Sequence, residues 1–490
     1  MSTQHQTRET AARRPGYATV ALLASGATFL AILDATIANL AVAGMRKTFH
    51  DASVADLSWV ISLYAITFAA ILAPAGRLAD VMGRRTLYAI GIGLFSLMSL
   101  ICAIAPVLPV LLAARALQGV GAAAMIPASL AVILVDSPPE RRLAAIGVWS
   151  ASASAAAAVG PSLGGLLIDA FTWRAVFIIN VPIGIALLVG LMRVVQGSAG
   201  RRGPLPDVLG TAALALGIGG LVLGVTKGTD WHWTGTRTLT SLAVGAALVA
   251  LALWRSARQQ VPAIETKLWR NRTFALANVV SLLFGAALYA WLLVGVLFLV
   301  NVWHYSELAA GFALSPGAVF SAVAAIGIGR ALGRWNPRVA VLAGCVLITA
   351  MAAWLVVWLP ADAHFVQLWL PTATISGFGF GAVSTGVSSA AALSVQPVQF
   401  AGATGLNMAA RQVGGALGIA VLAAILAGGD PARPHVYSHV LLFCALTAAG
   451  AGIVGLGLSL RPKAAPAGQQ PAKRTASATS TDRAQTANPT

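Results

Sequence analysis

Charged residues are scarce in this sequence. Asp, Glu, Lys and Arg make up 10% of its 490 residues, whereas hydrophobic residues make up 58% and the mean hydropathy is +0.81. Soluble domains carry about 25% charged residues, which keep their surfaces hydrated. The composition therefore excludes a soluble globular protein and indicates a chain that lies mostly within a lipid bilayer.

Cysteine is nearly absent as well. Cys102, Cys345 and Cys444 lie far apart in apolar stretches, which excludes a disulfide-rich framework, and we expect them to pack as small apolar side chains. The chain also lacks a G-x-x-x-x-G-K-[ST] loop, which excludes a self-contained ATP-driven pump.

Candidate metal ligands are few and scattered. His435 and His439 are four residues apart beside Asp430, a spacing that suits a metal on one helix face, but no cysteine or second acid lies nearby. We therefore expect these histidines to cap the last helix at the membrane interface. We expect no metal, cofactor or catalytic site.

What the sequence does contain is fourteen apolar stretches long enough to cross a bilayer as helices, which takes about 20 residues each. Short connections rich in Pro, Gly or charge separate them. The first stretch follows a basic leader, but it is too long for a signal peptide and lacks a clean small-residue cleavage site, so we expect it to be retained. The expected helices are 17–43, 56–76, 86–105, 108–134, 142–168, 174–194, 208–226, 238–256, 273–300, 308–329, 338–359, 364–393, 399–427 and 438–460.

The positions of Lys and Arg predict the orientation, since short cytoplasmic loops retain an excess of these residues. With both termini inside, 24 of the 32 Lys and Arg fall on the cytoplasmic side and six on the opposite side. The formal net charge of +17 is then a signal of topology, and no nucleic-acid partner is needed to account for it. We expect a multi-pass protein of the inner (plasma) membrane with cytoplasmic tails at 1–16 and 461–490, the second of them disordered.

Asp34 is the one acid that lies well within an apolar stretch. Arg115 enters the fourth stretch from the outer side, so at about 1.5 Å per residue the two side chains lie at similar depth and can pair. Burial disfavours an ionised carboxylate, whereas a neighbouring guanidinium favours it. An Asp whose Arg partner moves away and returns during the transport cycle can therefore bind and release a proton. The alternatives are a permanent ion pair that only holds two helices together, or an Asp34 bonded to Thr36 or Asn39.

Arg411 and Gln412 form a second polar site inside the thirteenth stretch. Charges within a membrane are expensive and often functional, but this pair fits a packing role equally well.

Several segments resemble one transporter family. The loop Gly76-Arg77-Leu78-Ala79-Asp80-Val81-Met82-Gly83-Arg84-Arg85 allows a tight turn through its glycines, and Asp80 can cap a helix start. It resembles the cytoplasmic loop signature of the major facilitator superfamily. One branch of this superfamily, the drug/proton antiporters, has fourteen helices. Five segments resemble this branch, namely 33–42, 112–123, Gly147 with 159–165, 173–182 and 411–418.

This resemblance implies an all-α membrane protein with the major facilitator fold, in which two six-helix bundles of inverted repeats bind substrate between them. Here the bundles would be 17–194 and 273–460, and 195–272 would be a linker with two extra transmembrane helices. The resemblance implies proton coupling at Asp34 and Arg115, and a gating loop at Gly76, Asp80, Gly83 and Arg84.

The resemblance also implies the direction of transport, because Gly147, Gly160, Pro161, Gly164 and Gly165 match a motif of exporters that symporters generally lack. Small residues let a second helix approach closely, and Pro161 can bend its own helix. The expected function is proton-coupled export by alternating access, with a proton-coupled symport permease for a small organic solute as the alternative.

We expect a monomer whose substrates are bulky amphipathic compounds such as antibiotics, neutral or even anionic, because an interior with one acid and two arginines attracts multivalent cations poorly. Apolar contacts would hold them in the cavity. The aromatic residues expected there fit packing or lipid contact as well. The residues expected to line the cavity are Asn39, Gln118, Tyr289, Trp291, Asn407, Arg411 and Gln412.

Overall fold

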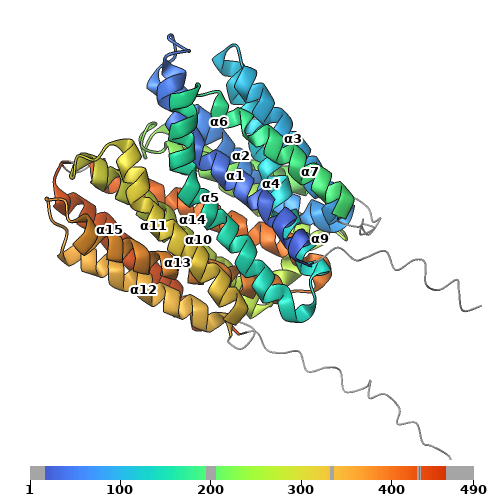
Figure 1. Cartoon of the computed structure of the whole chain (residues 1–490). Helices are drawn as coiled ribbons and strands as arrows, with labels where there is room; N and C mark the ends of the chain where they lie inside the picture. The colour runs from blue at the N-terminus through green and yellow to red at the C-terminus, as the bar shows by residue number, and fades with distance from the viewer. Residues whose placement is uncertain (1–16, 195–205, 332–335, 428–429, 431, 460–490) are drawn as a thin grey trace, which may run out of the picture. The chain divides into compact units, whose positions relative to one another are not determined.

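The computed structural model describes residues 17–194, 206–331, 336–427, 430 and 432–459. The expected tails at 1–16 and 461–490 lie outside these residues. Within them the secondary structure is helical. Thirteen of the fourteen expected stretches each correspond to one long helix, and the stretch 174–194 corresponds to two consecutive helices (Figure 1). The helices that precede residue 195 are α1 (Tyr17–Arg46), α2 (Val54–Met82), α3 (Arg84–Ile104), α4 (Leu108–Asp136), α5 (Arg142–Ala170), α6 (Ala175–Ile178) and α7 (Asn180–Val194).

The remaining helices include two that connect the halves of the chain. These are α8 (Val208–Lys227) and α9 (Thr236–Arg258), followed by the six helices of the second half. Short 3-10 turns and one π-helical turn also occur, at η1 (Pro139–Arg141), η2 (Thr266–Arg270), η3 (Phe365–Trp369) and η4 (Pro397–Gln399). The second-half helices are α10 (Arg272–Asn301), α11 (Glu307–Ala331), α12 (Pro337–Val357), α13 (Leu370–Leu393), α14 (Phe400–Ala427) and α15 (Pro434–Gly455).

The expected helix at 174–194 is interrupted, because α6 ends at Ile178 and α7 begins at Asn180. Pro182 explains the break, since it has no N–H to donate and its ring crowds the carbonyl four residues earlier, which is that of Ile178. The break places Asn180 at the start of α7, where it is fully buried.

Thirteen of the long helices in the described residues are apolar enough to count as membrane spans. In the same residues, the long helix that does not reach this hydropathy is α13, which is 24 residues long and rich in Gly, Ser and Thr. It packs against α11 and α12 and also contacts α5, α10 and α14. Neighbouring helices therefore cover it, so it needs less hydrophobicity than a helix that faces lipid.

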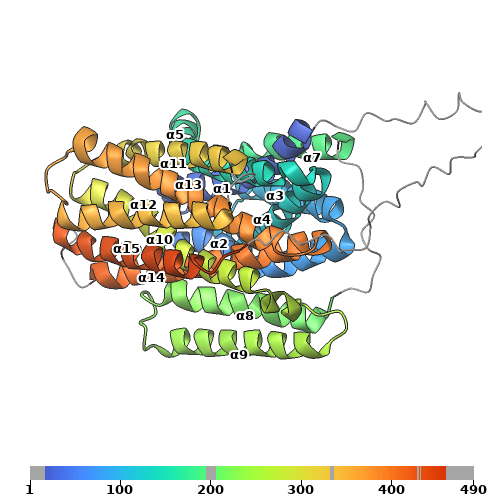
Figure 2. The same ribbon diagram turned by 90° about the horizontal axis from the view of Figure 1, so that it is seen from below.

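Helices α1 to α7 form the first half and contribute to two apolar clusters, one of which extends to residues of α8, α9, α13 and α14. Helices α10 to α15 form the second half and share a third cluster. The halves meet where α2 packs against α14 and α5 packs against α11. Helix α8 lies against α2 and α14, and α9 packs on the outside of α8 (Figure 2).

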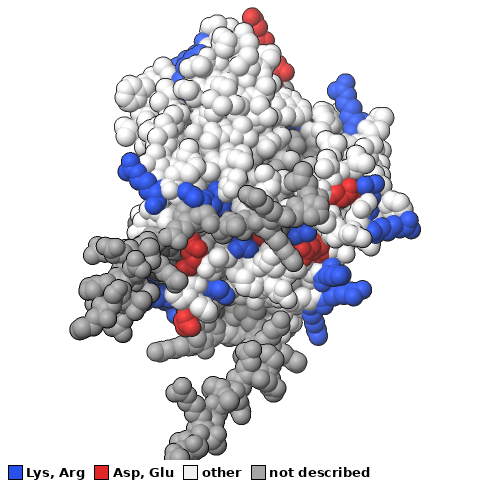
Figure 3. All heavy atoms as spheres, turned by 90° about the vertical axis from the view of Figure 1, so that its right-hand side faces the viewer, with Lys and Arg blue, Asp and Glu red and all other residues white. Residues whose placement is uncertain are grey.

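Basic side chains outnumber acidic ones on the side that is on the right in Figure 1, which Figure 3 views. The orientation of the chain in the membrane stays a prediction from the loop charges.

Glycines bring α10 and α14 into backbone contact. A Cβ atom placed on Gly414 would lie 1.9 Å from the Leu282 carbonyl oxygen, and one on Gly418 would lie 2.3 Å from the Ala286 oxygen. Backbone atoms cannot move aside as a flexible side chain can, so these positions admit no larger residue without separating the helices.

We predict that Gly414→Val destabilises the protein by about 1–3 kcal/mol through overpacking. The measurement is thermal unfolding of detergent-purified protein, monitored as the loss of the folded peak in size-exclusion chromatography. Gly327→Val is the matched control, because Gly327 is exposed and no atom lies within 4 Å of its added Cβ. Equal stability of the two variants would contradict the packing assignment.

Candidate functional site

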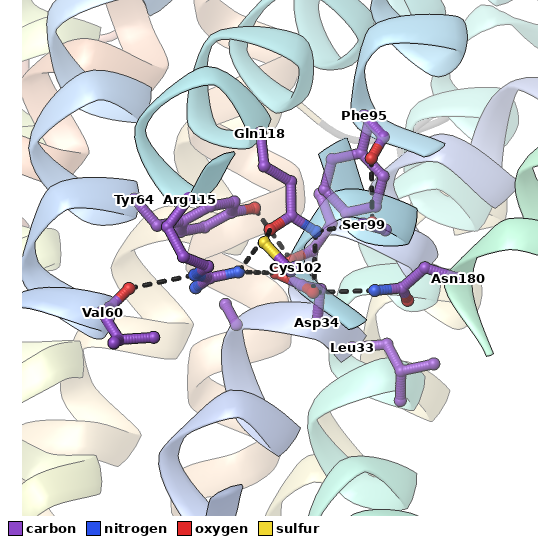
Figure 4. Close-up of polar contacts among 12 residues, drawn as sticks. Leu33, Asp34, Val60, Tyr64, Phe95, Ser99, Cys102, Arg115, Gln118 and Asn180 are labelled. Atoms are coloured by element: carbon purple, nitrogen blue, oxygen red, sulfur yellow. Dashed lines mark hydrogen bonds and ion pairs between the residues drawn. The ribbon is translucent and has the colours of Figure 1, made fainter. Parts of the chain in front are cut away.

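Asp34 and Arg115 form the buried ion pair that the sequence predicted. Nη1 of Arg115, on α4, lies 2.7 Å from Oδ2 of Asp34, on α1, and each side chain is only 1% exposed (Figure 4). In this position an unpaired charge would be several kcal/mol less stable, which explains why the two residues occur together. Thr36 and Asn39, considered as partners of Asp34, instead donate to carbonyls of their own helix.

Neutral side chains complete the environment of the pair. Oδ1 of Asp34 accepts hydrogen bonds from Asn180 Nδ2 at 2.7 Å and from Gln118 Nε2 at 3.0 Å. Gln118 Nε2 also lies 2.7 Å from Ser99 Oγ, and the Gln118 oxygen accepts from Arg115 at 2.6 Å. Gln118, expected in the substrate cavity, is therefore fully buried beside the ion pair.

The guanidinium of Arg115 is enclosed on its remaining sides. Its Nε donates to the Val60 carbonyl at 2.9 Å. The rings of Tyr64 and Phe177 lie 4.3 and 5.5 Å from its central carbon, close enough for cation–π attraction. Helices α1, α2, α3, α4, α6 and α7 thus contribute to one network centred on two opposite charges.

Sequence reasoning did not assign Asn180, Ser99 or Tyr64 to this site. Asn180 carried a signal, because it is a single amide within the apolar run Phe177-Ile178-Ile179-Asn180-Val181. Ser99 and Tyr64 carried none, since Ser and Tyr are common in membrane helices.

The segment 76–85 was expected to be a loop, but only Gly83 lies between helices, since α2 continues to Met82 and α3 begins at Arg84. This segment contacts the second half. Oδ2 of Asp80 accepts from the Gly402 N–H at 2.8 Å and Oδ1 from the Ala401 N–H at 3.3 Å, which caps the N-terminus of α14. A Cβ on Gly76 would lie 2.4 Å from the Ala401 carbonyl oxygen. Asp80 therefore caps the start of a helix, as expected, and that helix is α14, which is distant in the sequence.

The other residues of this segment hold it in place. Gly83 has φ 104° and ψ 128°, in the region that favours glycine. Arg84 lies 3.4 Å from Asp80 Oδ1 and donates to the Pro397 carbonyl. Arg77 forms a 2.6 Å ion pair with Glu265, which also accepts a hydrogen bond from Gln399.

The small residues of α5 contact helices on both sides. A Cβ on Gly160 would lie 2.1 Å from Thr36 Oγ1, and one on Gly164 would lie 2.8 Å from Ile37, both on α1. Toward α11, a Cβ on Gly147 would lie 2.5 Å from the Ala325 oxygen, and one on Gly165 would lie 3.2 Å from Leu308. Pro161 also faces α11, where it is 2.9 Å from a Cβ placed on Gly311.

The expected cavity residues of the second half surround Arg411. Arg411 is 8% exposed, and its two terminal nitrogens lie 3.4 and 3.2 Å from the hydroxyls of Ser384 and Ser388. Its neighbour Gln412 accepts a 2.6 Å hydrogen bond from Tyr289.

The remaining cavity candidates differ in exposure. Asn407 is buried and donates to the Ala277 carbonyl at 3.2 Å. Trp291 is buried edge-on against Phe380. Asn39 is exposed.

Sequence comparison relates the chain to proteins named for drug resistance or export. It is 33% identical over 439 residues to the multidrug resistance protein Stp of Mycobacterium tuberculosis, covering 86% of this chain and 81% of the relative. It is 31% identical to the methylenomycin A resistance protein of Streptomyces coelicolor, covering 84% and 86%. It is 32% identical to the tetracenomycin C resistance and export protein of Streptomyces glaucescens, covering 81% and 73%.

Comparison with solved structures finds a transporter with a similar fold. The crystal structure of the human organic anion transporter MFSD10 matches 89% of this chain and 100% of its own, with a TM-score of 0.63. At 16% identity this likeness shows the fold alone. The sequence model of the Major Facilitator Superfamily matches residues 24–419, and on this match the chain belongs to that superfamily.

Proposed function

We propose that this chain is a proton-coupled exporter that moves bulky amphipathic compounds, such as antibiotics, out of the cell in exchange for protons. The resistance and export functions in the names of its relatives support the direction and the substrate class. The observation that carries proton coupling is the ion pair of Asp34 and Arg115, which is buried in the first half and accepts hydrogen bonds from Gln118 and Asn180.

Protonation of Asp34 is the proposed coupling step. A neutral Asp34 no longer attracts Arg115 as an ion, but Arg115 keeps its hydrogen bonds to the Val60 carbonyl and the Gln118 oxygen. Arg115 therefore remains partly satisfied when the pair is broken. Because the pair joins α1 to α4, its loss allows these helices to shift, and deprotonation draws them together again.

The rocking units would be the bundles 17–194 and 273–460, with 195–272 as the linker that carries the two extra helices. Substrate would bind between the bundles, beside Asn39, Tyr289, Trp291, Asn407 and the Arg411-Gln412 pair. The gating loop supports this division, because Gly76 and Asp80 of the first unit contact the first turn of α14 in the second.

We further propose that the protein works as a monomer in the plasma membrane with both termini in the cytoplasm. The excess of Lys and Arg on the predicted cytoplasmic side, 24 against six, supports this orientation. Its partners are lipid, protons and a small-molecule substrate. We assign it no nucleic-acid partner, cofactor or enzymatic reaction.

Asp34→Asn is predicted to reduce pH-driven substrate accumulation in inverted vesicles to the level of vesicles without the protein, because the side chain can no longer exchange a proton. Substrate counterflow, which needs no proton gradient, should persist. Because Asp34→Asn leaves Arg115 unpaired, the double variant Asp34→Asn with Arg115→Gln is the control for folding.

Two results would contradict this mechanism. Uphill export that survives Asp34→Asn would remove the carboxylate from the coupling step. Proton-driven uptake instead of exchange would favour a symport permease.

Asp80→Asn is predicted to weaken the contact with the N-terminus of α14 by about 1 kcal/mol, since a neutral cap interacts less with the helix dipole. The closed arrangement at this end should then open roughly five-fold more often. The measurement is the alkylation rate of Leu406→Cys, whose side chain lines the small pocket beside Asp80. An unchanged rate would show that Asp80 does not hold the gate.

The orientation is tested with single cysteines in a background that lacks Cys102, Cys345 and Cys444. Glu140→Cys and Asp362→Cys place thiols at exposed positions on opposite faces of the predicted topology. An impermeant maleimide added to intact cells should label position 362 and not position 140. The reverse pattern would invert the proposed topology.

A further inference from the structure

Arg411 is a buried cation whose hydrogen-bonding capacity is not filled. Its contacts to Ser384 and Ser388, at 3.4 and 3.2 Å, are long for a guanidinium, whose charge-assisted bonds are usually about 2.7–2.9 Å. Its Nε has no hydrogen-bond partner among the described residues. A guanidinium offers five N–H donors, so several are available for a ligand.

Arg115 is also buried, but it has close hydrogen-bonding partners, so the unfilled capacity of Arg411 is not a general consequence of burial. Both arginines are at least nine-tenths buried, but Arg115 has contacts of 2.6 to 2.9 Å to a carboxylate, an amide oxygen and a carbonyl. In the described residues no ion pair includes Arg411. The acids of 273–460 are Glu307, Asp362 and Asp430, all outside the middle of the helices.

The surroundings of Arg411 suit an anion attached to an apolar body. The Phe284 ring lies 5.4 Å from its central carbon, and Phe284 and Trp291 both contact the ring of Phe380. These three aromatic rings provide apolar surface next to a single positive charge, which is how small-molecule sites combine affinity and orientation.

Tyr289 adds a hydroxyl group close to this cluster. It donates a 2.6 Å hydrogen bond to the side-chain oxygen of Gln412, the residue that follows Arg411 in α14.

We propose that Arg411 binds the negatively charged group of the substrate, a carboxylate or sulfonate carried on an aromatic body. The role in transport rests on the exporter function proposed above, whereas the binding itself does not. Tyr289 and Gln412 lie beside the charged group, and the rings of Phe284, Phe380 and Trp291 contact the apolar body. The alternative is that Arg411 only joins α14 to the serines of α13.

The test is binding of two matched fluorescent probes to the full chain in lipid nanodiscs, with empty nanodiscs subtracted. The probes are 1-anilinonaphthalene-8-sulfonate and the uncharged N-phenyl-1-naphthylamine, which share one ring system. Wild-type protein should bind the sulfonate more tightly. Arg411→Gln should weaken sulfonate binding roughly ten- to hundred-fold, the value of a charged hydrogen bond, and leave the neutral probe unchanged.

Two variants serve as controls. Arg411→Lys keeps the charge but not the forked geometry, so its sulfonate affinity should be intermediate. Arg338→Gln removes an exposed cation on α12 and should change neither affinity. The proposal is overturned if Arg411→Gln keeps the sulfonate preference, if it weakens both probes equally, or if the wild-type protein shows no preference.

Proton-driven transport of both probes separates this inference from the proposed function. If Arg411-dependent binding is present but a pH gradient drives no export, the exporter function fails and the anion site stands. If the neutral probe is exported and the protein binds the sulfonate no more tightly than the neutral probe, the anion site fails and the exporter function stands.

Discussion

The cost of a charge inside a membrane is the constraint on which the first half of this structure depends. Asp34 and Arg115 are almost completely buried, and either one alone would be destabilised by several kcal/mol. Five further side chains and one backbone carbonyl are arranged around them, from α2, α3, α4, α6 and α7. The network fixes the positions of these helices relative to one another, and in the proposed mechanism protonation of Asp34 changes those positions.

The second half buries a charge without such a counterpart. Arg411 has hydroxyl groups and an aromatic ring around it but no acid among the described residues. The two halves therefore differ in chemistry although both are six-helix arrangements. One half holds a carboxylate with its counter-ion in place, and the other holds an arginine whose counter-ion, in the anion site proposed above, is the substrate.

Close backbone contacts join the two halves. At Gly76 and Ala401, and at Gly147 and Gly329, the approach is too close for any side chain. Such contacts do not stretch gradually, so they are either made or lost. Asp80 adds hydrogen bonds at the same end of the molecule by capping α14. These discrete contacts fit alternation between two packed states better than continuous bending.

The sequence by itself determined the membrane class, the fourteen helices and the pairing of Asp34 with Arg115, because apolar length and the cost of buried charge act along each helix separately. Only the tertiary structure decided that Asn180 and Ser99 complete the ion-pair network and that Gln118 belongs to it. It also decided that Asp80 caps a helix 322 residues further along the chain. The physical reason is that hydropathy and residue spacing define a helix and its depth, whereas rotation about the helix axis and the choice of neighbours arise only from packing all the helices together.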